Sequence, residues 1–389
     1  MRPAPIYLDH AATTPARAEV LEAMLPWFTS KFGNPSSSHR LGREARAAYD
    51  EARERIAVCL GAHADEIVFT SGGTESDNLA ILGPWSVRRA AGRDAVVTVP
   101  TEHKAVLEVA HHVAQSGGTE RLVPVDAAGR VRMDALDAAL DDRVAVCAVM
   151  WINNETGVIQ DVPGITALAK ARGALVHTDA VQAFGKLPID VRTLPIDTLA
   201  LSGHKIGGPK GIGALFLRRG TPYAPLFHGG AQDRGRRPGT ENVACAIGLA
   251  VAAERTLAER EQEWARLEAL RDTLQRAILA RVPDAVIHSG EAARAPHILN
   301  LSVPGTDSES LLMALDLAGV CASGGSACQS GSVGASHVLA AMGVPRDLAA
   351  GALRLSLGSL TTDADVARVA EVFPTLVEKA RRLAGAGAF

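Results

Sequence analysis

Lys205 is a residue that could form a covalent bond with a carbonyl compound. It follows the apolar run Thr198–Leu201 in a glycine-rich stretch, and the chain has only seven lysines. A lysine beyond a strand, flanked by Ser202 and His204, can form a Schiff base with a carbonyl cofactor while its neighbours bind a phosphate. A single lysine is more often an exposed loop residue, and we interpret Lys210 in the same stretch in that way.

An acidic side chain and a glycine turn could complete such a site. Asp179 ends a short apolar run, and open α/β sheets bind ligands beyond the carboxyl ends of their strands. Its carboxylate can keep a ring nitrogen protonated, although for a lone Asp the capping of a helix is an equally common role. Gly73 and Thr74 stand where a strand turns into a helix, so backbone N–H groups and a hydroxyl can hold a phosphate there. A tight turn without a ligand is the alternative.

Together, these three features predict a pyridoxal phosphate enzyme. Such enzymes need an acid, a lysine and a phosphate-binding turn at the strand ends of one sheet, and the combination outweighs the separate alternatives. Neither G-x-x-x-x-G-K-[ST] nor G-x-G-x-x-G occurs in the chain, so a nucleotide-binding loop is not indicated.

Alternating strands and helices must position these residues. Short apolar runs predict buried strands at 66–70, 95–100, 144–152, 174–178 and 198–201. Helices are predicted between them at 44–60, 76–82 and 104–115. Strands separated by helices imply βαβ units, so we expect an α/β fold with a mainly parallel, doubly wound sheet. Residues 15–255 would form this large domain.

The pattern changes after the stretch 229–242, which is rich in Gly and Arg and is expected to be an exposed loop. Apolar residues at helical spacing from Leu257 to Ile278 predict a long amphipathic helix. Further elements are expected at 297–303, 311–317 and 353–357, followed by a last helix. We assign residues 1–14 and 256–389 to a smaller α+β domain, with a mobile loop at 322–336 made mostly of Gly, Ser and Ala.

Composition excludes several classes of protein. The 389 residues suggest two or three domains, and 47% hydrophobic with 21% charged residues is the balance of a globular protein. A formal net charge of −3 argues against a nucleic-acid binder. We see no secretory signal, and no apolar stretch approaches the roughly 20 residues of a membrane span. Five scattered cysteines without a C-x-x-C pair argue against disulfides or a zinc site and fit a reducing cytoplasm, and no metal is expected.

Sequence motifs along practically the whole chain resemble those of the cysteine desulfurases, which are aminotransferase-like pyridoxal phosphate enzymes of fold type I. The matching segments occur in the family's order: Tyr7–Pro15, Gly33–Ser36, Phe69–Asn78, Thr101–Val106, Asn153–Gly157, Asp179–Gln182, Ser202–Gly211, Ser326–Cys328 and Arg354–Gly358.

The resemblance implies a role for each matching residue. Lys205 would carry the cofactor and later move the substrate's Cα proton, and His103 would stack on the ring and assist that transfer. Asp179 would pair with the pyridine nitrogen, and Gln182 would hydrogen-bond the phenolic oxygen. The residues implied to hold the phosphate are Gly73, Thr74, Ser202, His204 and, from the neighbouring subunit of a homodimer, Thr240.

The substrate side of the site is implied in the same way. Arg354 would clamp the substrate carboxylate with its bidentate fork, and its alternative role is a structural salt bridge. Asn34 and Asn154 would also contact substrate, Asn154 lying near the cofactor oxygen as well. A capping or core role is the alternative for His103.

Cys328 is the implied sulfur acceptor. It lies in the centre of the Gly/Ser/Ala-rich loop, where there is no core to fill, whereas Cys59, Cys147, Cys245 and Cys321 are expected to be inert packing residues. The implied reaction converts L-cysteine to L-alanine and leaves a persulfide on Cys328. A sulfur-acceptor protein, either an iron–sulfur scaffold or a tRNA-thiolation enzyme, would then take up the sulfur.

The motif around Cys328 also departs from the family pattern. Gly324 stands where Ser is usual, Gln329 where Thr is usual, and 333–336 replaces a familiar Leu-Glu-Pro-Ser, which bears on loop behaviour and acceptor choice. Relatives with a longer C-terminal tail use it to dock a scaffold protein, and the resemblance does not extend to that partner. The rival interpretations are a selenocysteine lyase, which would not need Cys328, and a catalytically silent scaffold, which would not need Lys205, Asp179 and His103 together.

Overall fold

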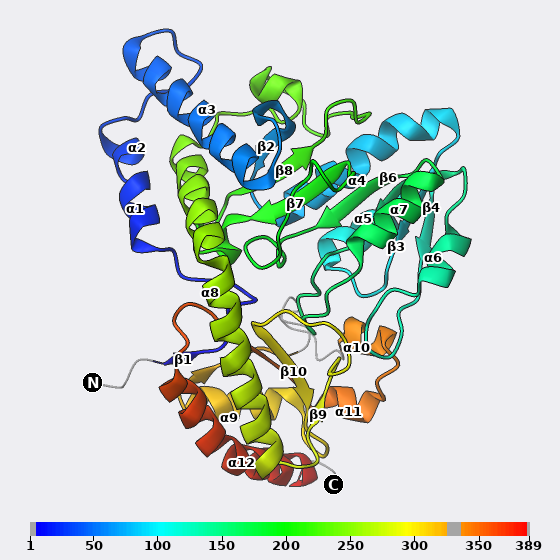
Figure 1. The fold of residues 1–389 in the computed structure, drawn as a ribbon, viewed down its shortest axis with the longest axis vertical. Coiled ribbons are helices and arrows are strands. Elements are labelled where there is room, and N and C mark those ends of the chain that lie inside the picture. The colour runs from blue at the N-terminus through cyan, green and yellow to red at the C-terminus, as the bar shows by residue number, and fades with distance from the viewer. Residues whose placement is uncertain (1–4, 325–335, 387–389) are drawn as a thin grey trace.

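A seven-stranded sheet forms the centre of the larger part of the molecule (Figure 1). The computed structural model describes residues 5–324 and 336–386. The strand order is β2-β8-β7-β6-β5-β3-β4, and the strands from β7 to β4 run parallel, while β8 is antiparallel to both of its neighbours. Their bounds are β2 Ile67–Thr70, β3 Ala95–Thr98, β4 Thr119–Leu122, β5 Val144–Ala148, β6 Leu175–Asp179, β7 Thr198–Ser202 and β8 Gly213–Leu217.

Helices cover both faces of this sheet, as the nearly all-apolar strand sequences require. Val96 and Val146 pack with α4 and α5, whereas Val97 and Cys147 belong to the core on the other face. That second face is covered by α3, α7 and the first half of α8. The helices of this part are α1 Ala18–Met24, α2 Pro26–Thr29, α3 Arg40–Leu60, α4 Gly73–Arg88, α5 Lys104–Gln115, α6 Met133–Ala139 and α7 Val162–Ala171.

A smaller α+β unit follows, with its own core. It contains the antiparallel sheet β12-β10-β9 and the parallel pair β1-β11. The strands are β1 Ile6–Tyr7, β9 Val286–Ile287, β10 Ile298–Ser302, β11 Val320–Cys321 and β12 Ala352–Ser356. The helices are α8 Val243–Arg281, α9 Ser308–Leu317, α10 His337–Ala341, α11 Arg346–Ala350 and α12 Asp363–Ala386.

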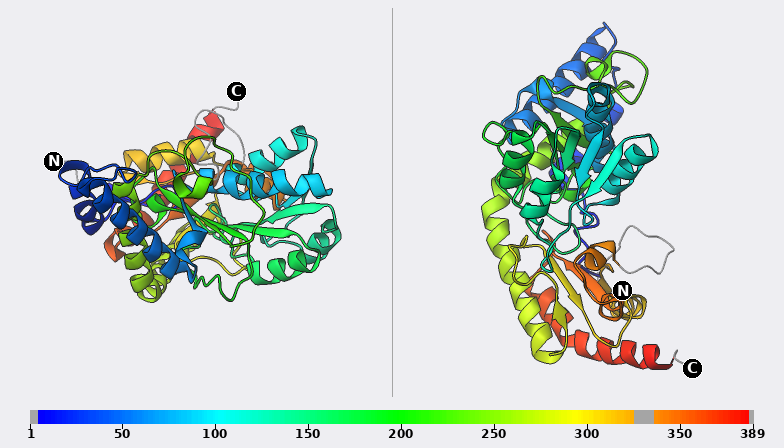
Figure 2. Two further views of the ribbon diagram at one scale, coloured as in Figure 1. Left: turned by 90° about the horizontal axis from the view of Figure 1, so that it is seen from above. Right: turned by 90° about the vertical axis from the view of Figure 1, so that its right-hand side faces the viewer.

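Helix α8 connects the two units, with its 39 residues running along one side of both (Figure 2). Its apolar side chains up to Ala253 belong to the large core, and those from Leu267 onward belong to the small one. Val338 and Leu339 of α10 pack into the large core, although they follow the small unit's strands in the chain. The division at residue 255 therefore stays a prediction, and α10 together with Ala349 and Ala352 packs across it.

The observed elements differ from the sequence expectations mainly at their ends. Helix α4 begins at Gly73 rather than Ser76 and continues through Pro84 to Arg88. Strand β5 ends at Ala148, four residues earlier than expected, although Val149 still donates its N–H to the carbonyl of His177. The fold class is the expected one: α/β with a mainly parallel sheet.

Candidate active site

Lys205 lies in the short helical turn Gly203–Lys205 directly after β7. Its Nζ donates hydrogen bonds to the carbonyls of Ala11 (2.6 Å) and Ala12 (2.7 Å), so the N-terminal segment crosses the sheet edge beside the lysine. Lys210, five residues farther along, is exposed. The structure therefore separates the two lysines of this segment as the sequence predicts.

The start of α4 has the properties of a phosphate site. No side chain caps this helix, and Thr74 lies in its first turn. A Cβ on Gly73 would lie 2.7 Å from Cγ2 of Val181, and the same turn faces Ser202 at the end of β7. A glycine is therefore needed where these segments meet, and the uncapped helix N-terminus attracts anions.

His204 lies next to Lys205 and is hydrogen-bonded to the N-terminal segment. Its Nδ1 is 3.1 Å from Oγ1 of Thr13. Burial and the neighbouring Lys205 lower the pKa of His204 to about 4, so the ring is neutral at physiological pH. It can then contribute a hydrogen bond, but not a charge.

Asp179 ends β6 on the same sheet edge, and its side chain is buried. Its Oδ1 accepts the N–H of Val181 (2.8 Å), and within the described part of the chain it forms no ion pair. Burial raises the pKa of Asp179, while the charges of His103 and Lys205 act in the opposite direction. A buried carboxylate near two basic groups is suited to hold a protonated ring nitrogen.

His103 begins α5, directly after β3 and the turn that follows it. Its Nδ1 accepts the N–H of Ala105 (3.1 Å), which places the ring at the helix N-terminus. The capping role considered as the alternative for this histidine is thus present in the structure, and its role at the cofactor stays a prediction. That bond occupies Nδ1 and orients the ring at the start of α5.

Two further residues behind Asp179 were missed by the sequence analysis. Asp77 of α4 lies 3.1 Å from Nε2 of His177, whose Nδ1 lies 3.0 Å from Oγ1 of Thr198. Burial and the charge of Asp179 raise the pKa of Asp77 well above its ordinary value, and burial lowers that of His177 to about 3. The sequence could have indicated His177, because it stands two residues before Asp179 in the same strand and therefore shares a face with it.

Arg354 lies in β12 with its side chain almost fully buried. One Nη donates to the carbonyl of Asn154 (2.9 Å) and the other pairs with Asp9 (2.8 Å), while Nε has no partner among the described residues. The structural salt bridge considered as an alternative is therefore present. The carboxylate clamp stays a prediction, and Asp9 is a partner that the sequence analysis did not foresee.

Cys328 lies outside the described residues, but the chain on either side of its segment is described. Ser323 exchanges backbone hydrogen bonds with Arg354 (2.7 and 3.3 Å). On the other side, Ser336 caps α10 and donates its hydroxyl to Glu155 (2.5 Å), the residue after Asn154. Burial raises the pKa of Glu155 to about 7. Both ends of this segment are thus attached to residues that adjoin or belong to the candidate site.

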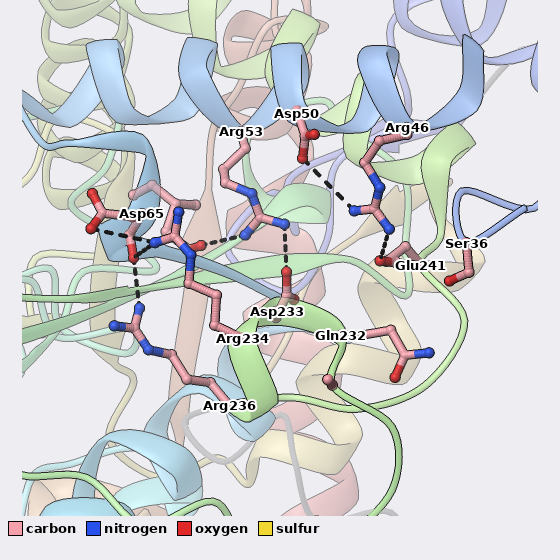
Figure 3. A pocket seen from close by; sticks show the side chains of 12 residues that line it. Ser36, Arg46, Asp50, Arg53, Asp65, Gln232, Asp233, Arg234, Arg236 and Glu241 are labelled. Atoms are coloured by element: carbon pink, nitrogen blue, oxygen red, sulfur yellow. Dashed lines mark hydrogen bonds and ion pairs between the residues drawn. The ribbon is translucent and has the colours of Figure 1, made fainter. Parts of the chain in front are cut away.

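The loop that carries Thr240 is attached to the start of α4 and to α3. Arg237 pairs with Glu75 (2.9 Å), the residue after Thr74. A hollow of about 390 Å³ separates part of this loop from α3, and Figure 3 shows arginine and acidic side chains facing one another across it. Its pairs join Arg46 to Glu241 (2.5 Å) and Arg53 to Asp233, which adopts a left-handed backbone (φ 46°).

Two of the expected site residues have only local contacts within one chain. Thr240 is exposed and lines a shallow hollow of its own loop. Asn34 is also exposed, and its side chain accepts the N–H of Ser36 (2.8 Å) in the turn before α3. Asp179, Ser202, Lys205 and Gly73 lie at or just beyond the ends of strands of the large sheet, whereas Thr240 and Asn34 stay predictions without a described contact to them.

The remaining cysteines behave as packing residues. Cys147 is fully buried in β5, where burial raises its pKa to about 12, and burial raises that of Cys59 to about 11. Over the described ranges, no group of His, Cys, Asp or Glu side chains could hold a metal ion. No described helix has both the length and the apolar character needed to cross a membrane.

The residues present fit pyridoxal phosphate. The uncapped start of α4 offers N–H groups for a phosphate, Asp179 offers a buried carboxylate without an ion-pair partner among the described residues, and Lys205 offers a primary amine between them. With the mainly parallel sheet, this arrangement defines a fold type I pyridoxal phosphate enzyme.

Comparison with known proteins agrees. The aminotransferase class-V family model matches residues 6–369. A cysteine desulfurase of Gluconacetobacter diazotrophicus is 47% identical over 97% of this chain and 94% of its own. A solved NifS-like protein is 35% identical (TM-score 0.90, 96% and 99% of the two chains), and a structure of SspA in complex with cysteine is 35% identical (TM-score 0.80, 90% and 98%). The chain belongs to the aminotransferase class-V family and, within it, to the cysteine desulfurases.

Proposed function

We propose that this enzyme converts L-cysteine to L-alanine and transfers the sulfur to its own Cys328. The observation that carries the proposal is the convergence of Lys205, Asp179 and the uncapped start of α4 at one sheet edge. Arg354 lies beyond them in the small unit, where its unpartnered Nε is a donor for a substrate carboxylate. Pyridoxal phosphate, when bound, withdraws electrons from the substrate's α-carbon and so acidifies its C–H bond.

The chain's own residues would then perform four tasks. Asp179 holds the ring nitrogen protonated, because a buried carboxylate is stabilised by a cation. Lys205 removes the Cα proton and returns it, with assistance from His103. Arg354 orients the substrate through its carboxylate. These are the assignments made from the sequence, and they are supported by the positions of Asp179 and Lys205 at the ends of the neighbouring parallel strands β6 and β7.

Cys328 performs the sulfur transfer in this proposal. Its thiolate forms an S–S bond with the substrate sulfur, the Cβ–S bond breaks, and the carbon takes the electron pair and a proton to become the methyl group of alanine. Covalent geometry limits the Cα of Cys328 to about 18 Å from that of Ser323, because only five Cα-to-Cα steps join them. Ser323 is hydrogen-bonded to Arg354, so this tether begins beside the proposed carboxylate clamp.

The test is product analysis with the purified protein, loaded with cofactor and given L-cysteine and a reducing thiol. We expect alanine and sulfide in equal amounts, because each turnover releases one of each. Without the thiol, one extra sulfur atom per chain should appear on Cys328 in peptide mass spectrometry. Turnover of selenocysteine without a sulfur atom on Cys328 would instead favour the lyase interpretation.

The persulfide requires an acceptor, and we propose that a protein of iron–sulfur cluster assembly or of tRNA thiolation takes it in the cytoplasm. The support is chemical: a cysteine persulfide is a carrier for sulfur in a reducing compartment. The departures at Gly324 and Gln329 lie within four residues of the donor cysteine, where they bear on acceptor choice.

We further propose that the enzyme is a homodimer with shared sites. Leu21, Leu25, Phe28 and Phe32 on α1, α2 and the following turn expose more than half of their side-chain area in the single chain, as at an interface. Thr240 is exposed on a loop that its ion pairs hold in place, so it is available to a partner's phosphate site.

Replacing Thr240 by alanine should weaken cofactor binding by about tenfold, because a hydroxyl contact to a charged phosphate is lost. Mixed dimers test whether that contact crosses the interface. At a cofactor concentration too low to load the Thr240→Ala homodimer, co-expression of Thr240→Ala and Lys205→Ala chains should recover about a quarter of the wild-type activity per chain, since half of the dimers are mixed and one of their two sites is intact. Recovery of none, or a monomeric mass in light scattering, would contradict the shared site.

A further inference from the structure

Gln182 is held in one orientation by a carbonyl that it shares with Lys205. Its Nε2 donates to the carbonyl of Ala11 (2.9 Å), and the same oxygen accepts from Nζ of Lys205 (2.6 Å). A carbonyl oxygen only accepts hydrogen bonds, so the amide must turn its NH₂ group toward Ala11 and its Oε1 away. One N–H of Gln182 is used by Ala11, and the second is left for another acceptor.

His297 completes the environment of this amide. Its Nε2 lies 3.2 Å from Oε1 of Gln182, and both side chains are buried. Because Oε1 can only accept, the proton of the neutral ring must be on Nε2. Nδ1 is then a bare acceptor, and this buried atom has no partner among the described residues. The orientation of one carbonyl therefore determines both the amide orientation and the tautomer of the histidine.

The surroundings keep His297 neutral. Burial lowers its pKa well below the ordinary value, and the nearby basic groups lower it further: Lys186, His10, Arg354 and Arg271. A cavity of about 70 Å³ lies beside the pair, lined among others by Lys186, Lys205 and His10. A second proton on the ring would be repelled from this side, so His297 stays neutral and keeps the tautomer that donates from Nε2 at neutral pH.

We propose that His297 is a positioning residue, which acts through Gln182 and keeps one Gln182 N–H available to an anionic oxygen of the bound cofactor. This proposal rests on the proposed function, because it takes the phenolic oxygen of pyridoxal phosphate as that acceptor. Without His297, Oε1 would lose its donor and the amide could rotate or shift from Ala11. His297 lies in the small unit, before β10, and Gln182 in the large one, so the contact also joins the two units at the cofactor.

The test compares three variants of the cofactor-loaded protein by the pH dependence of its visible absorption, without substrate. His297→Phe keeps a ring but removes the donor. His297→Gln can place an amide N–H near the position of Nε2, whereas the shorter His297→Asn cannot. When an anionic oxygen loses a hydrogen-bond donor, it attracts a nearby proton more strongly. The pH at the midpoint of the absorption change should therefore rise by about half a pH unit or more in the Phe and Asn variants. His297→Gln should restore the wild-type midpoint.

A double-variant cycle decides whether the effect passes through Gln182. Gln182→Ala alone should raise the midpoint, and His297→Phe added to it should change nothing further. Wild-type midpoints in the Phe and Asn variants, or shifts that add to that of Gln182→Ala, would overturn the proposal. If His297→Phe fails to fold, the Gln and Asn variants still carry the comparison.

The proposed function can fail independently of this inference. Its own test is alanine formation by the wild type, whereas the titration needs only the bound cofactor. A protein that binds cofactor and shows the His297 shifts but makes no alanine would retain the positioning role and lose the desulfurase assignment.

Discussion

Replacement of Lys205 by alanine should abolish both the covalent attachment of the cofactor and alanine formation from L-cysteine. In the structure, Nζ of Lys205 is the amine at the sheet edge, held by the carbonyls of Ala11 and Ala12 between the start of α4 and Asp179. In the proposed function, removing it eliminates both the group that attaches the cofactor and the base that moves the Cα proton. Loss of a positioned base alone reduces rates by about 10⁴-fold at the upper end of the usual range.

The measurement is alanine formed per unit time, together with borohydride reduction and peptide mapping of the cofactor. Wild-type protein should carry the reduced cofactor on the peptide containing Lys205. Lys210→Ala is the matched control, because Lys210 is exposed and stands five residues away in the same segment. Its variant should retain colour and activity. A cofactor found on Lys210, or on Lys186, would show that the attachment site is wrongly assigned.

Replacement of Cys328 by alanine should stop the reaction after substrate binding but before alanine forms, which is later than in the Lys205→Ala variant. The variant loses its nucleophile but keeps Lys205, Asp179 and Arg354, so it should bind cofactor normally and should respond to L-cysteine with a change in visible absorption. Alanine formation should fall to background, because no thiolate is present to accept the substrate sulfur. The decisive comparison is the rate of alanine formation by this variant and the wild type on L-cysteine, side by side.

Cys321→Ala is the control for Cys328→Ala. Cys321 lies in β11, seven residues before Cys328, where burial raises its pKa and leaves it a poor nucleophile. Its variant should form alanine at close to the wild-type rate. Comparable rates from Cys328→Ala would make that residue a bystander, and the enzyme would then be better described as a lyase.

The positions of the candidate site residues in the fold were predictable where these residues follow a strand or begin a helix. The helix predicted at 104–115 matches α5 residue for residue, and His103 caps it. Asp179 and Lys205 lie at the ends of β6 and β7 because parallel strands bring their carboxyl ends to one edge. Periodicity and turn chemistry are local, so one sequence is enough to identify them.

The partners of these residues were not predictable in the same way. Arg354 pairs with Asp9, Gln182 with His297, His177 with Asp77 and Glu155 with Ser336, and each pair is separated by a hundred residues or more. No local pattern encodes such a pair, because it forms only when two elements pack against each other. Nor could the sequence show that a carbonyl of Ala11 lies between Lys205 and Gln182.

For this protein, the sequence by itself determined the α/β class, the residues that follow the strands and the family to which their motifs belong. The tertiary structure decided which charges are compensated, which rings stay neutral and which unit each late helix joins. Short-range hydrogen bonding and hydrophobic periodicity act between neighbours in the chain, so they can be predicted from the sequence. Burial shifts pKa values and selects tautomers only after distant segments have excluded water from them, and this exclusion is a property of the folded chain.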